Sequence, residues 1–143
     1  MTKKYQPKHP INYYLIINRE RTLLKQHYDF IKFELQNGIL YCYGEYKPTE
    51  FSINYKYRIK YDPVKAPQVT IRYPNIEYND DIHMYQKSKS LCLYHKSDLN
   101  WNINCHLFDT IIPWTHEWFV YYELYCITGN WEHPFVPHKI NEK

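Results

Sequence analysis

The chain has 143 residues and a formal net charge of +3, with lysines spread along the sequence rather than clustered. This length suits one domain, residues 1–143, with a sizeable hydrophobic core. The weak, scattered charge argues against a dedicated nucleic-acid surface, and no stretch approaches the roughly 20 apolar residues of a membrane span.

The first predicted element is a helix over residues 10–27. Pro10 suits the first turn of a helix, and apolar side chains recur at helical spacing at Ile16, Ile17, Leu23 and Leu24. We expect one face of this helix to pack on the core.

Four strands are predicted next. Apolar and polar side chains alternate over residues 30–36, and Asn37-Gly38, a hairpin turn signal, leads into a second strand over residues 39–46. Residues 51–61 alternate most regularly, with one face on the core and one in water. The fourth strand covers residues 69–73 and ends at Pro74. Sequential strands joined by short turns predict an antiparallel meander.

A long irregular stretch and a second helix complete the predicted fold. Residues 74–104 show no sustained period, which is typical of a functional loop. A helix follows Pro113, and Gly129 is placed to cap its end. Aromatic side chains share one face of this helix, at Trp114, Trp118, Tyr121, Tyr122 and Tyr125. We expect the two tryptophans in the core and residues 130–143 on the surface. Helices and strands are segregated, so the fold class is α+β.

The cysteines predict the redox state of the protein. They occur singly, at Cys42, Cys92, Cys105 and Cys126, without a Cys-x-x-Cys pair. Residues 2–4 lead into polar rather than apolar residues, so we expect no secretory signal and a cytoplasmic protein with free thiols. Cys42, in a strand, and Cys126, on the last helix, are expected in the core.

No metal or cofactor site is predicted. Cys105-His106 is one potential ligand pair without a second pair, which makes a zinc site improbable. His133 and His138 flank prolines at ligand-like spacing, and we interpret them as tail residues.

Cys92 is the candidate for chemistry. It lies in the irregular stretch, in the run Ser90-Leu91-Cys92-Leu93-Tyr94-His95, between the predicted sheet and the predicted second helix. A cysteine between leucines is by default a buried small hydrophobe. At a junction between sheet and helix, however, it can also be held rigidly while remaining accessible to a reaction partner.

The order of elements and the motifs around Cys92 resemble those of ubiquitin-conjugating enzymes. Ala66–Ile71 resembles the strand that approaches the active site, Ser90–Tyr94 matches the cysteine box, and Trp101 falls at the downstream tryptophan. The closer resemblance is to the bacterial branch found in type II CBASS anti-phage operons. It is carried by His83-Met84-Tyr85, Leu91-Cys92-Leu93-Tyr94, Pro113-Trp114-Thr115-His116-Glu117-Trp118, Tyr122-Glu123 and Thr128-Gly129-Asn130-Trp131.

Two departures from the eukaryotic pattern are evident. His83-Met84-Tyr85 stands where that family has His-Pro-Asn, and Lys89 stands where it has a glycine. Tyr73-Pro74-Asn75 looks like His-Pro-Asn but lies too far upstream, and we interpret it as the end of the fourth strand. The chain holds no adenylating domain, so an activating enzyme would be a separate chain or unnecessary.

The resemblance implies a fold and a reaction. The fold would have an N-terminal helix, a four-stranded antiparallel meander, an active-site loop and C-terminal helices. Cys92 would carry an acyl group as a thioester and pass it to an amine. The acyl donor would be the C terminus of a cGAS/DncV-like nucleotidyltransferase, with other proteins as possible acceptors, and the role would be anti-phage defence.

Polar residues near Cys92 in the sequence are candidates for assisting this transfer. Tyr85 can supply a hydroxyl donor, and His83 or His95 can position it or shuttle a proton. Asp98 and Asp109 are candidate partners for an incoming lysine amine.

Two alternative functions remain open from the sequence. The first is a catalytically silent relative of conjugating enzymes that only binds a partner. The second is a cysteine hydrolase that uses Cys92 with His83 or His95. A hydrolase normally needs a group that orients its histidine, and no motif in the sequence identifies one.

Overall fold

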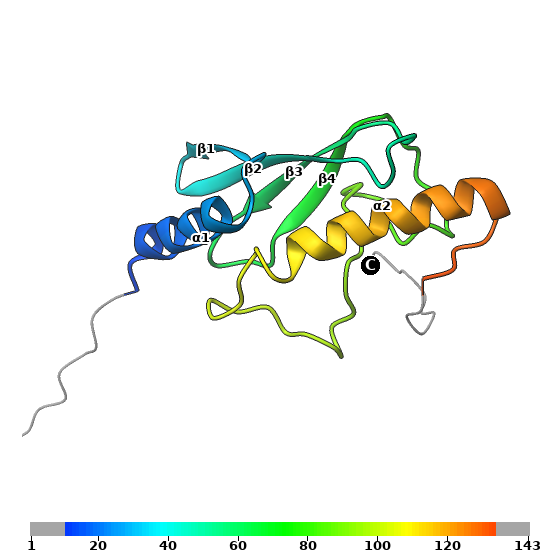
Figure 1. Ribbon diagram of the computed structural model, residues 1–143. Helices are drawn as coiled ribbons and strands as arrows, with labels where there is room; N and C mark the ends of the chain where they lie inside the picture. The colour runs from blue at the N-terminus through cyan, green and yellow to red at the C-terminus, as the bar shows by residue number, and fades with distance from the viewer. Residues whose placement is uncertain (1–10, 134–143) are drawn as a thin grey trace, which may run out of the picture.

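A computed structural model describes residues 11–133 and shows an α+β architecture (Figure 1). Four strands form one sheet in the order β1-β2-β3-β4, and each neighbouring pair is antiparallel. Helices α1 (Tyr13–His27) and α2 (Ile111–Thr128) precede and follow the sheet in the chain. A segment of residues 74–110, without a regular helix or strand, joins β4 to α2. The predicted fold class and layout are confirmed.

Helix α1 begins three residues later than the sequence suggested. Asn12 is its N-cap, and its side chain accepts hydrogen bonds from the backbone N–H groups of Tyr14 (3.0 Å) and Leu15 (3.3 Å). An asparagine cap satisfies amides that have no partner within the helix. Pro10, expected in the first turn, lies outside the described residues. The predicted core face is present, with Ile16, Ile17 and Leu24 buried.

The first hairpin is the predicted one. Strand β1 (Lys32–Gln36) pairs with β2 (Ile39–Tyr46) through a two-residue loop. Asn37 and Gly38 both have left-handed backbone angles, with φ of 52° and 78°. These angles are those of a type I′ turn, whose twist matches that of the paired strands.

Strand β3 (Tyr55–Tyr61) is shorter than predicted, because residues 51–54 do not join the sheet. Phe51 is 90 % exposed, so its assignment to the core face was wrong. A turn precedes the strand instead, in which Ser52 N–H donates to the Thr49 carbonyl (3.1 Å). Glu123 of α2 holds this turn through Ser52 Oγ (2.7 Å) and Tyr55 Oη (3.0 Å).

Strand β4 and the core follow the sequence pattern closely. Strand β4 (Gln68–Tyr73) ends before Pro74 as predicted. Side chains from the inner face of the sheet join those of both helices in one cluster, and Figure 1 shows both helices on that side of the sheet. Gly44 of β2 is needed here, because a Cβ at this position would lie 2.5 Å from ring atoms of Tyr57.

Helix α2 begins at Ile111, two residues before the proline that was expected to precede it. Pro113 lies in the first turn, where backbone amides have no acceptor within the helix, so its missing N–H is tolerated. Gly129 caps the other end with φ of 79°, as predicted. On the predicted aromatic face, Trp118 is buried, whereas Trp114 is half-buried.

The two cysteines that were expected in the core differ in their exposure to solvent. Cys42 is fully buried, whereas Cys126 is exposed, so that prediction was wrong for Cys126. No residue of α2 after Phe119 is buried, because the last turns of the helix extend beyond the sheet (Figure 1). Ile127 is accordingly 80 % exposed.

The segment that leads into α2 is tied to α1 by a buried carboxylate. Glu20 is fully buried and accepts hydrogen bonds from Leu107 N–H (2.8 Å) and Arg19 Nε (2.8 Å), with His106 Nδ1 also 2.8 Å away. Such pairing offsets the large cost of burying a charge. Neither helix within residues 11–133 has the length and apolar character needed to cross a membrane.

Candidate functional site

A short hairpin within the irregular segment brings residues 83–85 beside residues 90–92. Met84 and Leu91 form an antiparallel bridge, Cys92 N–H donates to the His83 carbonyl (2.8 Å), and Tyr85 N–H donates to the Ser90 carbonyl (2.9 Å). The predicted site residues His83, Tyr85 and Cys92 are therefore adjacent, although Cys92 lies seven or more positions after the other two in the sequence.

The hairpin is docked on the sheet and closed by a left-handed residue. Leu91 N–H donates to the carbonyl of Val69 in β4 (2.8 Å), and Lys89 N–H closes the turn on the Tyr85 carbonyl (2.9 Å). Lys89 has φ of 61°, at the position where conjugating enzymes have glycine. This conformation costs a residue with a side chain about 1–2 kcal/mol.

Two tryptophans hold His83. Trp118 Nε1 donates to the carbonyls of Ile82 (3.0 Å) and His83 (3.2 Å). The Trp131 ring stacks on the His83 ring, with centroids 5.4 Å apart and an interplanar angle of 20°. His83 itself has a left-handed φ of 55°. Trp118 of the Glu-Trp motif and Trp131 of the Thr-Gly-x-Trp motif thus fix the side of the hairpin that pairs with Cys92.

The Cys92 thiol faces a tyrosine hydroxyl. Its Sγ lies 3.4 Å from Tyr85 Oη. The neutral thiol donates to the hydroxyl, and the hydroxyl donates to the sulfur once the thiol has lost its proton. Cys92 is 5 % exposed, and this burial raises the pKa of its thiol, while the hydrogen bond with Tyr85 opposes the shift. Tyr85 therefore favours the thiolate, the form that reacts as a nucleophile.

A small cavity adjoins the thiol. Its volume is about 10 Å³, room for a single water molecule. Side chains from three separate parts of the chain line it, including His83, Cys92, Glu117, Trp118, Trp131 and His133. A thiol, two imidazoles and a carboxylate therefore line one small cavity.

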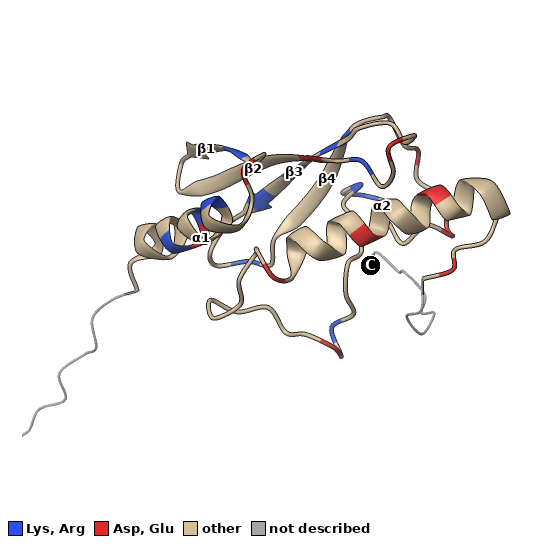
Figure 2. Cartoon of the chain, viewed as in Figure 1, with Lys and Arg blue, Asp and Glu red and all other residues tan. Residues whose placement is uncertain are grey.

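The sequence did not predict the pairing of Glu117 with His133 in this cavity. His133 Nε2 lies 3.0 Å from Glu117 Oε1, and the His133 side chain is only 7 % exposed. Glu117 is one of two acidic residues on α2, which carries no lysine or arginine (Figure 2). His133 was interpreted as a tail residue, and the signal that could have found the pair is the Pro-Trp-x-x-Glu-Trp motif, whose glutamate is Glu117.

The other predicted candidates lie outside this cavity. His95 is exposed and begins a turn in which Asp98 N–H donates to its carbonyl (2.9 Å). The His95 ring lies 2.8 Å from Ser97 Oγ. Asp98 and Asp109 are also exposed. Burial raises the pKa of Tyr28, and the nearby Asp109 carboxylate adds to the shift.

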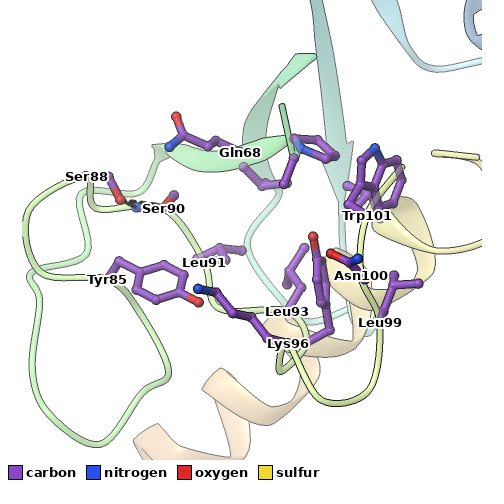
Figure 3. A pocket seen from close by; sticks show the side chains of 15 residues that line it. Gln68, Tyr85, Ser88, Ser90, Leu91, Leu93, Lys96, Leu99, Asn100 and Trp101 are labelled. Carbon is purple, nitrogen blue, oxygen red and sulfur yellow. Dashed lines mark hydrogen bonds between the residues drawn. The ribbon is translucent and has the colours of Figure 1, made fainter. Parts of the chain in front are cut away.

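A larger pocket lies on the other side of the hairpin (Figure 3). Its volume is about 650 Å³, within the range of about 300–1,000 Å³ typical of ligand sites. It extends from Gln68 at the start of β4 to Trp101, and Tyr85 and the leucines on either side of Cys92 line it. Among residues 11–133, no group of three or more side chains is arranged to hold a metal ion.

A comparison with known protein families identifies the family of the chain. A family model described as type II CBASS E2 protein matches residues 20–139. The chain belongs to the type II CBASS E2 family. This CBASS E2 protein therefore has a role in CBASS anti-phage defence. No curated protein matches it.

The family match includes all the residues that surround Cys92. Glu117, Trp131 and His133 fall within residues 20–139, as does the hairpin that carries His83 and Tyr85. The E2 designation associates the chain with conjugating enzymes, whose chemistry depends on a cysteine.

Proposed function

We propose that this CBASS E2 protein conjugates proteins through a thioester on Cys92. The observation that carries the proposal is the Cys92 thiol, 3.4 Å from the Tyr85 hydroxyl, in a chain of the E2 family. In the first step, Cys92 sulfur attacks an activated acyl carbonyl. A carbon–sulfur bond forms, the leaving group departs, and the thiol proton is released.

In the second step, an amine nitrogen attacks the thioester carbonyl. The carbon–nitrogen bond forms, the carbon–sulfur bond breaks, and Cys92 leaves as a thiolate while the nitrogen loses a proton. Tyr85 has two roles in these steps. Its hydroxyl stabilises the thiolate and donates to the oxyanion that develops on the carbonyl, for which one donor contributes about 3 kcal/mol.

The Glu117–His133 pair supplies the proton acceptor. Glu117 orients the His133 ring through the 3.0 Å contact, and His133 lines the cavity with Cys92. An imidazole with a carboxylate partner can take up the proton of the thiol or of the attacking amine. His83, stacked on Trp131, positions the Cys92 strand through its carbonyl.

The acyl donor and acceptor are assigned from the family resemblance. We propose that the C terminus of a cGAS/DncV-like nucleotidyltransferase is carried on Cys92 in the cytoplasm, and that an amine of another protein receives it. His95 and Asp98 lie on the exposed turn that directly follows Cys92, where an acceptor can contact them.

Intact-mass analysis of the protein co-expressed with the neighbouring genes of its operon tests the proposal. The expected result is an adduct with the mass of the acyl donor, absent in Cys92→Ala and released by hydroxylamine. Cys126→Ala is the matched control, because Cys126 is an exposed thiol outside the site and its removal should leave the adduct intact. A partner that co-purifies without any adduct would instead favour a silent binding module.

One observation favours a second candidate, a cysteine hydrolase. The sequence identified no group to orient a catalytic histidine, whereas the structure contains Glu117 beside His133. The two functions share the acyl-Cys92 intermediate and differ in its fate. A hydrolase releases a free acid in the presence of amines, whereas a conjugating enzyme forms an amide.

A further inference from the structure

We propose that the larger pocket binds an apolar side chain among the last three residues of the acyl donor. This inference rests on the proposed function, because the donor tail is defined as the peptide that Cys92 carries. We call the cavity between Gln68 and Trp101 the tail pocket.

The tail pocket and the thiol are joined by shared residues. Leu91 and Leu93 line the tail pocket, and Leu93 also lines the small cavity together with Cys92, so the two cavities adjoin at this residue. Tyr85 bridges the two sides. It lines the tail pocket and its hydroxyl contacts Cys92 Sγ at 3.4 Å. A peptide attached to the sulfur therefore starts at the edge of the tail pocket.

The interior of the tail pocket is suited to an apolar group. Val69 and Leu91 are buried, and Leu93 and Ile111 also line it. Its rim is polar, with Gln68, Ser88 and Asn100 exposed, and Figure 3 shows these side chains distributed around the cavity. An apolar floor with a few polar groups is the usual composition of a site that binds an apolar group and orients it.

One residue of the wall holds a buried donor that lacks a partner. Trp101 lines the tail pocket, and its Nε1 is buried without a hydrogen-bond partner among the described residues. A buried donor without a partner costs about 1–3 kcal/mol. A peptide carbonyl that displaced the covering side chains and reached this atom would satisfy the donor.

The length of the donor tail and the charge of the pocket lining limit which side chain can bind in the tail pocket. An extended chain covers about 3.3–3.6 Å per residue, so the last three residues of the tail span roughly 10 Å from the sulfur. Among the described residues that line the tail pocket, Lys96 carries the single charge, which disfavours a lysine or arginine side chain there. The apolar floor and the positive charge of Lys96 together favour an apolar rather than a basic side chain near the C terminus.

Peptide thioesters of mercaptoethanesulfonate test the pocket directly. In each reaction, the Cys92 sulfur forms a bond to the acyl carbon, and the bond between that carbon and the sulfur of mercaptoethanesulfonate breaks. Mercaptoethanesulfonate leaves as a free thiol with the Cys92 proton. We would compare tripeptides with leucine at one of the three positions and alanine at the others against the all-alanine peptide. One leucine position should raise the rate of Cys92 acylation at least about tenfold, as expected for a larger apolar group in a fitting pocket.

Two substitutions test whether the preference for leucine arises in the tail pocket. Leu99→Ala removes an apolar wall of the tail pocket and should reduce the leucine-to-alanine rate ratio at least about threefold. Phe51→Ala is the matched control, since Phe51 is an apolar side chain that is 90 % exposed and lies in the turn before β3. It should keep the rate ratio of the unchanged protein.

Binding to Cys92→Ala tests the pocket without any chemistry. The Trp101 indole N–H signal, assigned by its loss in Trp101→Phe, should shift when the leucine tripeptide acid is added. The all-alanine peptide should leave this signal unchanged.

Equal effects of all peptides on both the acylation rate and the Trp101 signal would overturn the proposed role of the tail pocket. Acylation at Cys92 without any leucine preference would overturn the pocket alone, whereas a shifted signal without acylation would overturn the proposed function alone.

Discussion

The Oε1 atom of Glu117 lies 3.0 Å from Nε2 of His133, and both residues line the cavity that holds the Cys92 thiol. Cys92 belongs to the hairpin, Glu117 to α2, and His133 to the segment after α2. In the mechanism proposed above, this pair is the proton acceptor for the thiol.

The pair is tested by replacing each member. His133→Gln and Glu117→Gln should each slow the transfer of an acyl group from Cys92 to an amine, by roughly 10²-fold for His133→Gln and less for Glu117→Gln, because the oriented proton acceptor is lost. The measurement is the rate of single-turnover transfer from loaded Cys92 to the amine.

A matched control is available for this test. His27→Gln replaces an exposed histidine at the end of α1 and should leave the rate unchanged. If His133→Gln retained the full rate, His133 would have no role in proton transfer.

Tyr85→Phe should have two separable effects. Loss of the hydroxyl removes the interaction that lowers the Cys92 pKa, so the pH midpoint for alkylation of Cys92 by iodoacetamide should move upward. Loss of the oxyanion donor should also slow acyl transfer by roughly 10²-fold. Circular dichroism should show an unchanged fold, because the aromatic ring remains. An unchanged midpoint together with an unchanged rate would remove Tyr85 from the mechanism.

Lys89→Gly should stabilise the protein. Lys89 has φ of 61°, a conformation that glycine adopts without the cost paid by other residues, although glycine loses more entropy on folding. The expected net gain in the free energy of unfolding is about 0.5–1 kcal/mol, measured by urea denaturation. Lys87→Gly, at an exposed position outside the left-handed region, should instead lower the stability. A loss of stability in Lys89→Gly would contradict the assigned backbone conformation.

His116 should make folding stability depend on pH. Burial lowers its pKa to about 4, whereas an unfolded chain has a histidine pKa near 6.5. Above pH 6.5 the imidazole is neutral in both states. As the pH falls from 6.5 to 4, mainly the unfolded chain takes up the proton, so the free energy of unfolding decreases by up to about 3 kcal/mol.

The measurement is urea denaturation between pH 4 and pH 8 for the unchanged protein and for His116→Gln. Glutamine keeps a polar partner for Tyr57 Oη, which lies 2.8 Å from His116 Nε2, but it does not titrate. The difference in stability between the two proteins should change across this range. Parallel curves would show that His116 titrates alike in the folded and unfolded chains.

The fold was predictable where local chemistry determined it. Asn37-Gly38 predicted the hairpin because a type I′ turn requires left-handed angles, and residues 39–46 form β2 with the predicted bounds. The prediction failed at Phe51, where alternation continued in the sequence but Glu123 of α2 holds a turn. Cys126 was likewise misplaced, because helical spacing does not show where a helix extends beyond its sheet.

The candidate site was predictable only in part. Cys92 and Tyr85 were identified through motifs, and the structure places their side chains 3.4 Å apart. The Glu117–His133 pair depends on how the chain returns to the hairpin after α2, which no local pattern in the sequence reports. The tail pocket likewise combines β4, the hairpin and Trp101, so it arises only from the tertiary fold.

The most direct measurement of the central claim is a single-turnover chase of the protein loaded with its acyl donor on Cys92. The loaded protein is mixed with an excess of amine, and the released product is identified by mass. Conjugation predicts an amide, with the mass of donor plus amine less one water, formed faster than free acid. Release of free acid alone, at a rate independent of the amine concentration, would contradict it.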